Sequence, residues 1–187
     1  MSMVTIEQAF KRIHRSDFIP ESLHDRVNVD APLPIGFGQT ISQPSTVRLM
    51  LEWLDAQIGE KILDLGSGSG WTTALLSQII GPSGRVFAVE RIPELVKMGR
   101  DNCNNVGIQN VIFFQAGKKY GLSKYSPYNR ILVSASAKKL PEELLDQLKI
   151  GGRLVIPIKN SIYIINKIDN DNYETREHPG FVFVPLV

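Results

Sequence analysis

The sequence predicts an α/β fold with a doubly wound, mainly parallel sheet and an antiparallel hairpin at its C-terminal end. Three observations support this prediction. Short apolar runs alternate with helical stretches from Lys61 onward. At Ile62–Trp71 an apolar run leads directly into a glycine-rich turn and then a helix. The last apolar runs have no helix between them, which favours an antiparallel pair at the sheet edge.

The first part of the chain is an irregular lead-in to this sheet. Ile6, Phe10 and Ile13 recur at helical spacing and predict a short amphipathic helix. Proline and glycine keep residues 31–38 non-helical. Pro44 suits the first position of a helix that continues to Leu54. We therefore expect one domain over residues 1–187, in which residues 1–44 form a lead-in on the substrate side.

The sheet elements follow from the alternation of apolar and helical patterns. The predicted strands are Lys61–Leu65, Arg85–Glu90, Val111–Gln115, Arg130–Ser134 and Arg153–Ile158. The predicted helices between them are Trp71–Ile80, Pro93–Val106 and Pro141–Leu148. The closing antiparallel pair is expected at Ile162–Ile168 and Phe181–Val184.

Composition and charge are those of an ordinary globular protein. The chain has 187 residues, of which 43% are hydrophobic and 21% charged, and a net charge of +2. A charge this small makes nucleic acid an unlikely partner, and no apolar run approaches the roughly 20 residues of a membrane span. The single cysteine, Cys103, excludes an internal disulfide and fits a cytoplasmic location. His14, His24 and His178 are isolated, and we expect no metal site.

The glycine-rich turn is the strongest local signal for a ligand. Glycine lets a ligand lie against the backbone, and the following helix offers free N–H groups at its N-terminus. Glu90 ends the next strand, where an acid can accept hydrogen bonds from both ribose hydroxyls of a nucleoside. Trp71 stands where a dinucleotide site needs a small residue, so S-adenosylmethionine, which lacks pyrophosphate, is the better candidate. The alternative is a tight turn with an incidental acid. The candidate cofactor-binding residues of the turn are Asp64, Gly66, Ser67, Gly68, Ser69 and Gly70.

A second motif, Leu33–Pro44, reads Leu-Pro-Ile-Gly-Phe-Gly-Gln-Thr-Ile-Ser-Gln-Pro. Together with the glycine turn it resembles the protein-L-isoaspartate O-methyltransferases, the protein-repair methyltransferases. The resemblance runs from about Ala9 to Leu186. Further matching segments are Arg15–Pro20, Glu90-Arg91, Ser126–Tyr128, Gln147–Pro157 and Phe183–Leu186.

The resemblance implies a Rossmann-like class I S-adenosylmethionine-dependent methyltransferase fold. It also implies methyl transfer to the free carboxylate of L-isoaspartyl residues in damaged proteins, with S-adenosylhomocysteine as product. Ser42 matches the substrate-side serine, and its alternative role is a helix cap. The C-terminal Phe183–Leu186 segment is expected to clasp the substrate peptide. The resemblance adds Thr40, Ile41, Arg91 and Gly117 to the cofactor-binding residues.

Several positions differ from the family pattern. An acid that faces the adenine amino group in the family is replaced here by Gly117, and Lys118 follows it. Asn129 replaces an aspartate, Asn28 replaces an aromatic residue, and Lys159 stands where a glycine is usual. A lost charge-assisted hydrogen bond costs about 1.5–3 kcal/mol, or roughly ten- to a hundredfold in affinity.

Three functions remain compatible with the sequence. The first is the isoaspartyl carboxyl methyltransferase. The second is a divergent relative with weak or no methyltransferase activity that works as a binding protein. The third is a methyltransferase for another acceptor, such as RNA or a small acid. Ser134-Ala135-Ser136-Ala137 follows the fourth predicted strand of the sheet, where methyltransferases acting on exocyclic amines carry a different motif, so amine acceptors are disfavoured.

Overall fold

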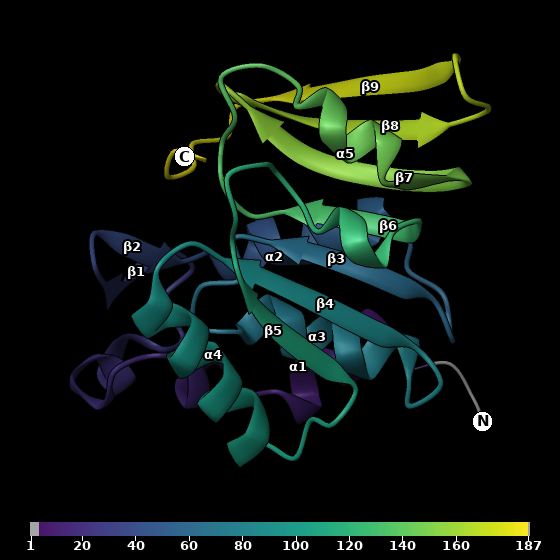
Figure 1. Ribbon diagram of the computed structural model, residues 1–187. Coiled ribbons are helices and arrows are strands. Elements are labelled where there is room, and N and C mark those ends of the chain that lie inside the picture. The colour runs from purple at the N-terminus through teal and green to yellow at the C-terminus, as the bar shows by residue number, and fades with distance from the viewer. Residues whose placement is uncertain (1–3, 187) are drawn as a thin grey trace.

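The computed structural model describes residues 4–186, in which a seven-stranded sheet forms the centre of the molecule. The order across the sheet is β5-β4-β3-β6-β7-β8-β9, with β5 low and β9 at the top in Figure 1. Strands β3 to β7 are parallel, and β8 runs antiparallel to both β7 and β9. The strands are β3 (Lys61–Leu65), β4 (Arg85–Glu90), β5 (Val111–Gln115), β6 (Tyr128–Val133), β7 (Leu148–Ile158), β8 (Ser161–Lys167) and β9 (Tyr173–Pro179).

Alternate residues of each central strand point to opposite faces of the sheet, which creates two cores. On one face, Ile62 of β3 packs with residues from four helices. On the other face, Leu63 and Leu65 pack with Leu144 of the short fifth helix and with the segment that connects β5 to β6. The helices of the first face are α1 (Ile6–Arg12), α2 (Pro44–Leu54), α3 (Trp71–Ile80) and α4 (Pro93–Asn105); α5 (Glu142–Asp146) covers the second.

The lead-in packs around the start of α3. Thr5 and Gln8 form a capping box at the N-terminus of α1, and Phe10 meets Trp71 of α3 edge-on at 5.5 Å between ring centroids. Two short 3₁₀ helices, η1 (Arg15–Phe18) and η2 (Glu21–Arg26), follow. The Pro- and Gly-rich segment then folds as a small hairpin of β1 (Leu33–Gly36) and β2 (Gln39–Ile41).

Most predicted elements are confirmed to within a few residues. Strands β3, β4 and β5 and helix α3 have the predicted bounds. Strand β7 starts five residues earlier than predicted, at Leu148, and α5 is shorter than its predicted range. The predicted helix from Pro44 to Leu54 is confirmed as α2, with Pro44 in its first turn.

The partner predicted for the closing antiparallel pair was wrong. Strand β8 pairs with β9, Tyr173–Pro179, and Phe181–Val184 lies outside any strand. As the edge strand, β9 is mostly exposed, so it is polar and lacks the apolar pattern on which the prediction relied. The apolar residues Phe181 and Phe183 are explained by packing of the irregular tail against the first core.

No helix within residues 4–186 has the length and apolar character needed to cross a membrane.

Candidate active site

A pocket opens where the parallel strands end at their carboxyl edge, on the left in Figure 1. We call it the edge pocket. Open α/β sheets bind ligands at this edge, because the connections diverge there. The lining residues come from the β1–β2 hairpin, from the loops after β3, β4, β5 and β6, and from the C-terminal tail. They are Ile35, Gln39, Thr40, Leu65, Gly66, Gly68, Val89, Glu90, Arg91, Ile92, Ala116, Gly117, Lys118, Lys119, Tyr120, Ser134, Ala135, Val184, Pro185 and Leu186.

The glycine-rich turn brings bare backbone to the pocket wall. Its amide at Gly66 donates to the Val89 carbonyl of the neighbouring strand at 2.8 Å, which fixes the turn against β4. Gly70 has φ +89°, and a Cβ there would lie 2.9 Å from the carbonyl oxygen of Gly99. Only glycine therefore allows α4 to pack this closely against the turn. Asn102 of α4 also donates to the Ser69 carbonyl at 2.9 Å.

Glu90 is the acid of the pocket, and three backbone amides hold its carboxylate. Oε2 accepts from Gly68 N at 3.0 Å, while Oε1 accepts from Arg91 N at 2.7 Å and Ile92 N at 3.0 Å. The side chain is only 8% exposed, so its rotamer is well constrained. Oε1 thus uses both of its acceptor sites and Oε2 one of two, so the carboxylate can accept a hydroxyl donor from a ligand at Oε2 without moving.

Asp64 belongs to β3, the strand next to β4, and lies two residues before Gly66 of the glycine turn. It is fully buried. Thr73 of α3 donates its hydroxyl to Asp64 Oδ2 at 2.5 Å. Among the described residues, Oδ1 has no hydrogen-bond partner. Burial and, to a lesser extent, the neighbouring Glu90 charge raise the pKa of Asp64 to about 7, although the hydrogen bond from Thr73 opposes this shift. A buried acceptor without a donor is costly, so this oxygen favours a cationic or hydrogen-bonding ligand group nearby.

Ser42 lies just beyond β2, half-buried, and outside the lining of the edge pocket. Its backbone carbonyl accepts from Arg15 at 3.1 Å. The alternative helix-cap role is not seen, because Gln43 is the N-cap of α2 without a side-chain cap. Instead Asp30 accepts from Ser45 N at 2.9 Å and from Gln43 Nε2 at 3.0 Å. These hydrogen bonds lower the pKa of Asp30.

The buried side chain of Arg15 connects the segment before β1 to the residue that follows β2. Its guanidinium donates to four backbone carbonyls at 2.7–3.3 Å and is 6% exposed. Burial lowers its pKa, and the Asp30 charge partly opposes that shift. The guanidinium also lies 5.6 Å from the centre of the Trp71 ring. The four acceptors are the carbonyls of Val27, Val29, Ala31 and Ser42.

The C-terminal tail closes the pocket against the segment after β6. The Ser136 amide donates to the Val184 carbonyl at 2.8 Å, and the Leu186 amide donates back to the Ser136 carbonyl at 2.8 Å. Ser136 and Pro185 therefore form an isolated parallel β-bridge. Val184, Pro185 and Leu186, which belong to the tail segment expected to cover the substrate peptide, therefore line the pocket.

The loop after β5 is held by Gln147, which the sequence did not single out as a site residue. Gln147 is buried, accepts from Leu122 N at 2.7 Å and donates to the Tyr120 carbonyl at 3.0 Å. Tyr128 donates its hydroxyl to the Leu122 carbonyl at 2.7 Å. These contacts set the course of residues 116–122 along the pocket.

The structure places six of the predicted residues on the pocket lining. These are Thr40, Gly66, Gly68, Glu90, Arg91 and Gly117. Ile41, Asp64, Ser67, Ser69 and Gly70 are buried behind it, and Ser42 stands beside it. Their roles in binding remain predictions.

The residues missed from the sequence are those that reach the pocket from distant segments. Ser134 and Ala135 follow a predicted strand, so the carboxyl-edge rule could have found them. Tyr120 has no such signal, because only tertiary packing brings its part of the loop to the pocket.

Cys103, Asn129 and the three histidines lie outside the lining of the edge pocket. Within residues 4–186, no three His, Cys, Asp or Glu side chains are grouped so that they could hold a metal ion. Burial raises the pKa of the Cys103 thiol to about 12, so this group is not a nucleophile. Asn129 accepts from the Lys61 amide at 3.0 Å and lies outside the pocket lining.

Comparison with known proteins gives one consistent result. The family model for protein-L-isoaspartate(D-aspartate) O-methyltransferase matches residues 2–187. The protein-L-isoaspartate O-methyltransferase of Methanopyrus kandleri is 42% identical over 187 residues, which cover 97% of this chain and 83% of the relative.

Two solved structures are also similar over nearly the whole chain. One protein-L-isoaspartate O-methyltransferase has a TM-score of 0.90 at 30% identity, and the match covers 98% of this chain and 62% of that one. A second, from Plasmodium falciparum and solved with S-adenosyl-L-homocysteine, has a TM-score of 0.85 at 26% identity. That match covers 97% of this chain and 89% of the other.

Proposed function

This chain belongs to the protein-L-isoaspartate(D-aspartate) O-methyltransferase family, and on that basis we propose that it methylates the free carboxylate of L-isoaspartyl residues in damaged proteins. The methyl donor is S-adenosylmethionine. The observation that carries the proposal is the edge pocket, in which the Glu90 carboxylate is held by three backbone amides beside the glycine turn.

The residues of the pocket fit this donor. Glu90 would accept a ribose hydroxyl at Oε2, and Gly66 and Gly68 offer backbone against which the ligand can lie. Asp64 Oδ1 and Ser67 Oγ are buried and have no partner within residues 4–186, so they would serve the polar amino-acid end. Gly117 leaves open space at the side of the pocket formed by the loop after β5. When bound, S-adenosylmethionine supplies an electrophilic methyl group.

The acceptor makes modest demands on the protein. A carboxyl group with a pKa near 4 is ionised at neutral pH and needs no general base. The protein must hold this carboxylate in line with the methyl group and exclude water. Ser42 could donate its hydroxyl to one carboxylate oxygen, and the C-terminal tail, Val184–Leu186, could cover the peptide. No histidine lies among the described residues of the pocket lining, which is compatible with this chemistry.

The direct test is transfer of a radiolabelled methyl group to an isoaspartyl peptide and to its normal aspartyl twin. We expect base-labile label in the isoaspartyl peptide alone. Equal labelling of both peptides, or none in either despite measured cofactor binding, would contradict the proposed acceptor. Calorimetric titration with S-adenosylmethionine supplies the binding measurement.

We expect Ser42→Ala to lower kcat for the isoaspartyl peptide by roughly ten- to a hundredfold, because one hydrogen bond to a charged acceptor is worth about 1.5–3 kcal/mol. The Kd of S-adenosylmethionine should stay within about twofold, since Ser42 lies outside the pocket lining. Ser45→Ala is the matched control: the same hydroxyl is removed from an exposed position three residues away. Unchanged turnover in Ser42→Ala would exclude the serine from the reaction.

We expect Gly117→Asp to tighten S-adenosylmethionine binding by roughly tenfold, through a charge-assisted hydrogen bond to the adenine amino group. A Cβ at Gly117 meets nothing within 4 Å, and the backbone there is not left-handed, so the side chain can be accommodated. Gly117→Ala adds the Cβ without the acceptor and should leave the Kd unchanged. Calorimetry that finds equal Kd values for both variants and the parent would refute the assignment.

We further propose isoaspartyl-containing peptides and proteins as the partners and the cytoplasm as the location. A reducing compartment suits a chain with a single free cysteine.

A further inference from the structure

The loops around the edge pocket carry positive charge almost alone. Residues 66–70, 91–92, 116–122, 134–140, 159–160 and 184–186 contain six Lys or Arg and no Asp or Glu. These six exceed the net charge of the whole chain, which is +2. We call them the cation ring: Arg91, Lys118, Lys119, Lys138, Lys139 and Lys159.

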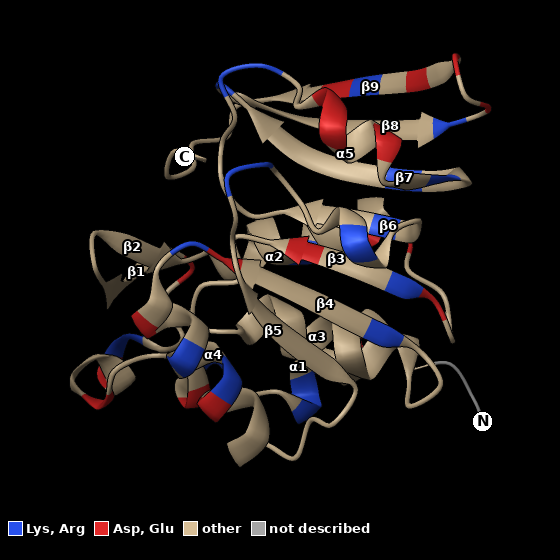
Figure 2. Ribbon diagram, in the orientation of Figure 1, with Lys and Arg blue, Asp and Glu red and all other residues tan. Residues whose placement is uncertain are grey.

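The ring is formed by the topology. Each of its members follows the carboxyl end of a parallel strand, namely β4, β5, β6 or β7, so all four loops meet at one edge of the sheet. Arg91, Lys118 and Lys119 line the pocket itself. Lys159 joins the segment after β6 through its amide, which donates to the Ala137 carbonyl at 3.1 Å. Figure 2 shows these blue loops together on the left of the molecule.

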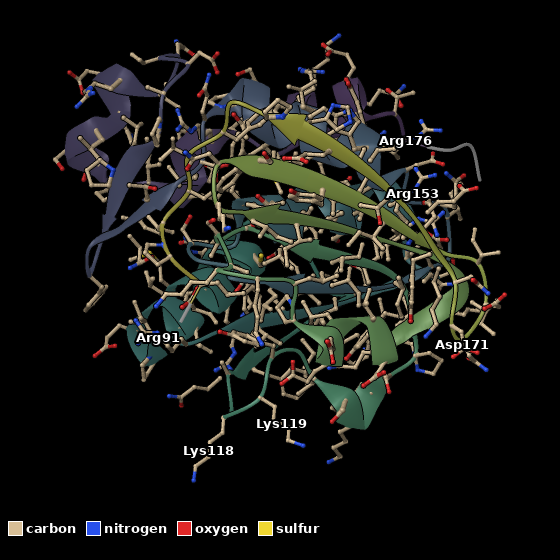
Figure 3. All side chains as sticks on the ribbon, turned by 90° about the horizontal axis from the view of Figure 1, so that it is seen from above. Arg91, Lys118, Lys119, Arg153, Asp171 and Arg176 are labelled. Atoms are coloured by element: carbon tan, nitrogen blue, oxygen red, sulfur yellow. The ribbon has the colours of Figure 1, made fainter. Side chains whose placement is uncertain are left out.

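The charges of the ring are not neutralised internally. All six side chains are exposed, and within residues 4–186 none takes part in an ion pair or donates a side-chain hydrogen bond. Figure 3 shows Lys118 and Lys119 extending away from the body of the protein, with Arg91 on the same side. The one acid of the pocket, Glu90, is turned into backbone amides.

At the other ends of the strands, opposite the edge pocket, arginines pair with acids. Arg153 there lies 3.7 Å from Asp55, and Arg130 lies 3.1 Å from Glu60. Figure 3 shows Arg153, Arg176 and Asp171 on the right, so that edge carries both signs. In the described part of the chain, the six cations of the ring therefore lack the acidic partners that Arg130 and Arg153 have at the other ends of the strands. Exposed charges of one sign around a cleft raise the local concentration of oppositely charged ligands.

We infer that the cation ring selects isoaspartyl sites that lie in acidic stretches of polypeptide. This inference rests on the proposed function and names its substrate class. The isoaspartyl carboxylate is itself an anion, and acids beside it in the peptide would face Lys138, Lys139 and Lys159 when it enters the pocket. Five of the six cations are lysines, which act as non-directional point charges and suit a flexible peptide of varied sequence.

The test uses three isoaspartyl peptides that differ only in their flanks, which are acidic, neutral or basic. Methyl transfer gives kcat and KM, and fluorescence anisotropy of labelled peptides gives Kd independently of turnover. We expect the acidic peptide to have the lowest KM and Kd at low salt, by about three- to tenfold over the neutral one, as exposed ion pairs allow. Its advantage should disappear at about 0.5 M salt, because the charges are then screened.

The variant Lys138→Gln/Lys139→Gln isolates the ring from the pocket, since neither residue lines it. In this variant the KM and Kd of the acidic peptide should rise close to those of the neutral peptide. The kcat and the Kd of the cofactor should stay the same. Lys124→Gln/Lys149→Gln is the matched control, because it removes two exposed lysines that lie before β6 and at the start of β7, at the other edge. The control should behave as the parent.

The outcomes separate the inference from the proposed function. Equal KM and Kd for all three peptides, or an equal loss for all three in Lys138→Gln/Lys139→Gln, would overturn the inference while methylation stands. Stronger competition by an RNA oligonucleotide than by polyglutamate of equal charge would also overturn it, in favour of nucleic acid. Charge-dependent peptide binding without any methyl transfer would remove the proposed function alone.

Discussion

Glu90→Ala lowers the affinity for S-adenosylmethionine by about a hundredfold or more, the largest effect on binding expected from any single change in the edge pocket. The carboxylate would accept a ribose hydroxyl at its free Oε2 site, and this charge-assisted hydrogen bond is worth about 1.5–3 kcal/mol. The substitution also leaves the amides of Gly68, Arg91 and Ile92 without their acceptor, so the turn loses the group that orders it.

Calorimetric titration measures this effect directly. Glu94→Ala is the control, because Glu94 is an exposed acid four residues away, in the first turn of α4. It changes the net charge equally and should leave the Kd within about twofold. Glu90→Gln keeps an acceptor oxygen and should fall between the parent and Glu90→Ala. If Glu90→Ala bound the cofactor as tightly as the parent, the nucleoside would have to lie elsewhere.

Arg15→Met is expected to affect both stability and turnover. The guanidinium satisfies four carbonyls in a site that is 6% exposed, and unsatisfied buried acceptors cost about 1–3 kcal/mol each before water compensates. We expect the free energy of unfolding to fall by about 3 kcal/mol or more, measured by urea denaturation. Because the carbonyl of Ser42 is one of the four acceptors, kcat should fall with it.

Kinetic constants measured well below the melting temperature of each Arg15 variant separate a role of Arg15 in positioning Ser42 from its role in stability. Arg15→Lys keeps the charge with fewer donors, so it should recover part of kcat, while the Kd of S-adenosylmethionine stays near that of the parent. Arg12→Met removes an exposed arginine of the preceding helix and should leave all three quantities unchanged. If Arg15→Met folded stably with unaltered kcat, Arg15 would have no part in placing the serine.

The local signals of the sequence predicted the central elements well. The run into the glycine turn predicted β3, and the acid at the end of the next strand predicted Glu90 on the pocket lining. These predictions succeed because each depends on residues close together in the chain: a buried parallel strand is apolar, and a tight turn needs glycine. The edge strand β9 was missed because an exposed strand carries no apolar pattern.

The arrangement of the site was decided only by tertiary structure. Nothing in the local sequence indicates that Arg15 donates a hydrogen bond to the Ser42 carbonyl. Nor does it indicate that Asp30 accepts from the Ser45 amide at the start of α2. Contacts between segments far apart in the chain likewise let Gln147 hold the loop after β5 and bring the tail to the pocket.

The fold class, the glycine turn and the acid beside it follow from the amino-acid sequence, because local backbone geometry and burial dictate them. The tertiary structure decided which loops surround the pocket and gathered six scattered cations at one edge. This gathering follows because parallel strands place all of their carboxyl ends together, whatever the distance between them along the chain.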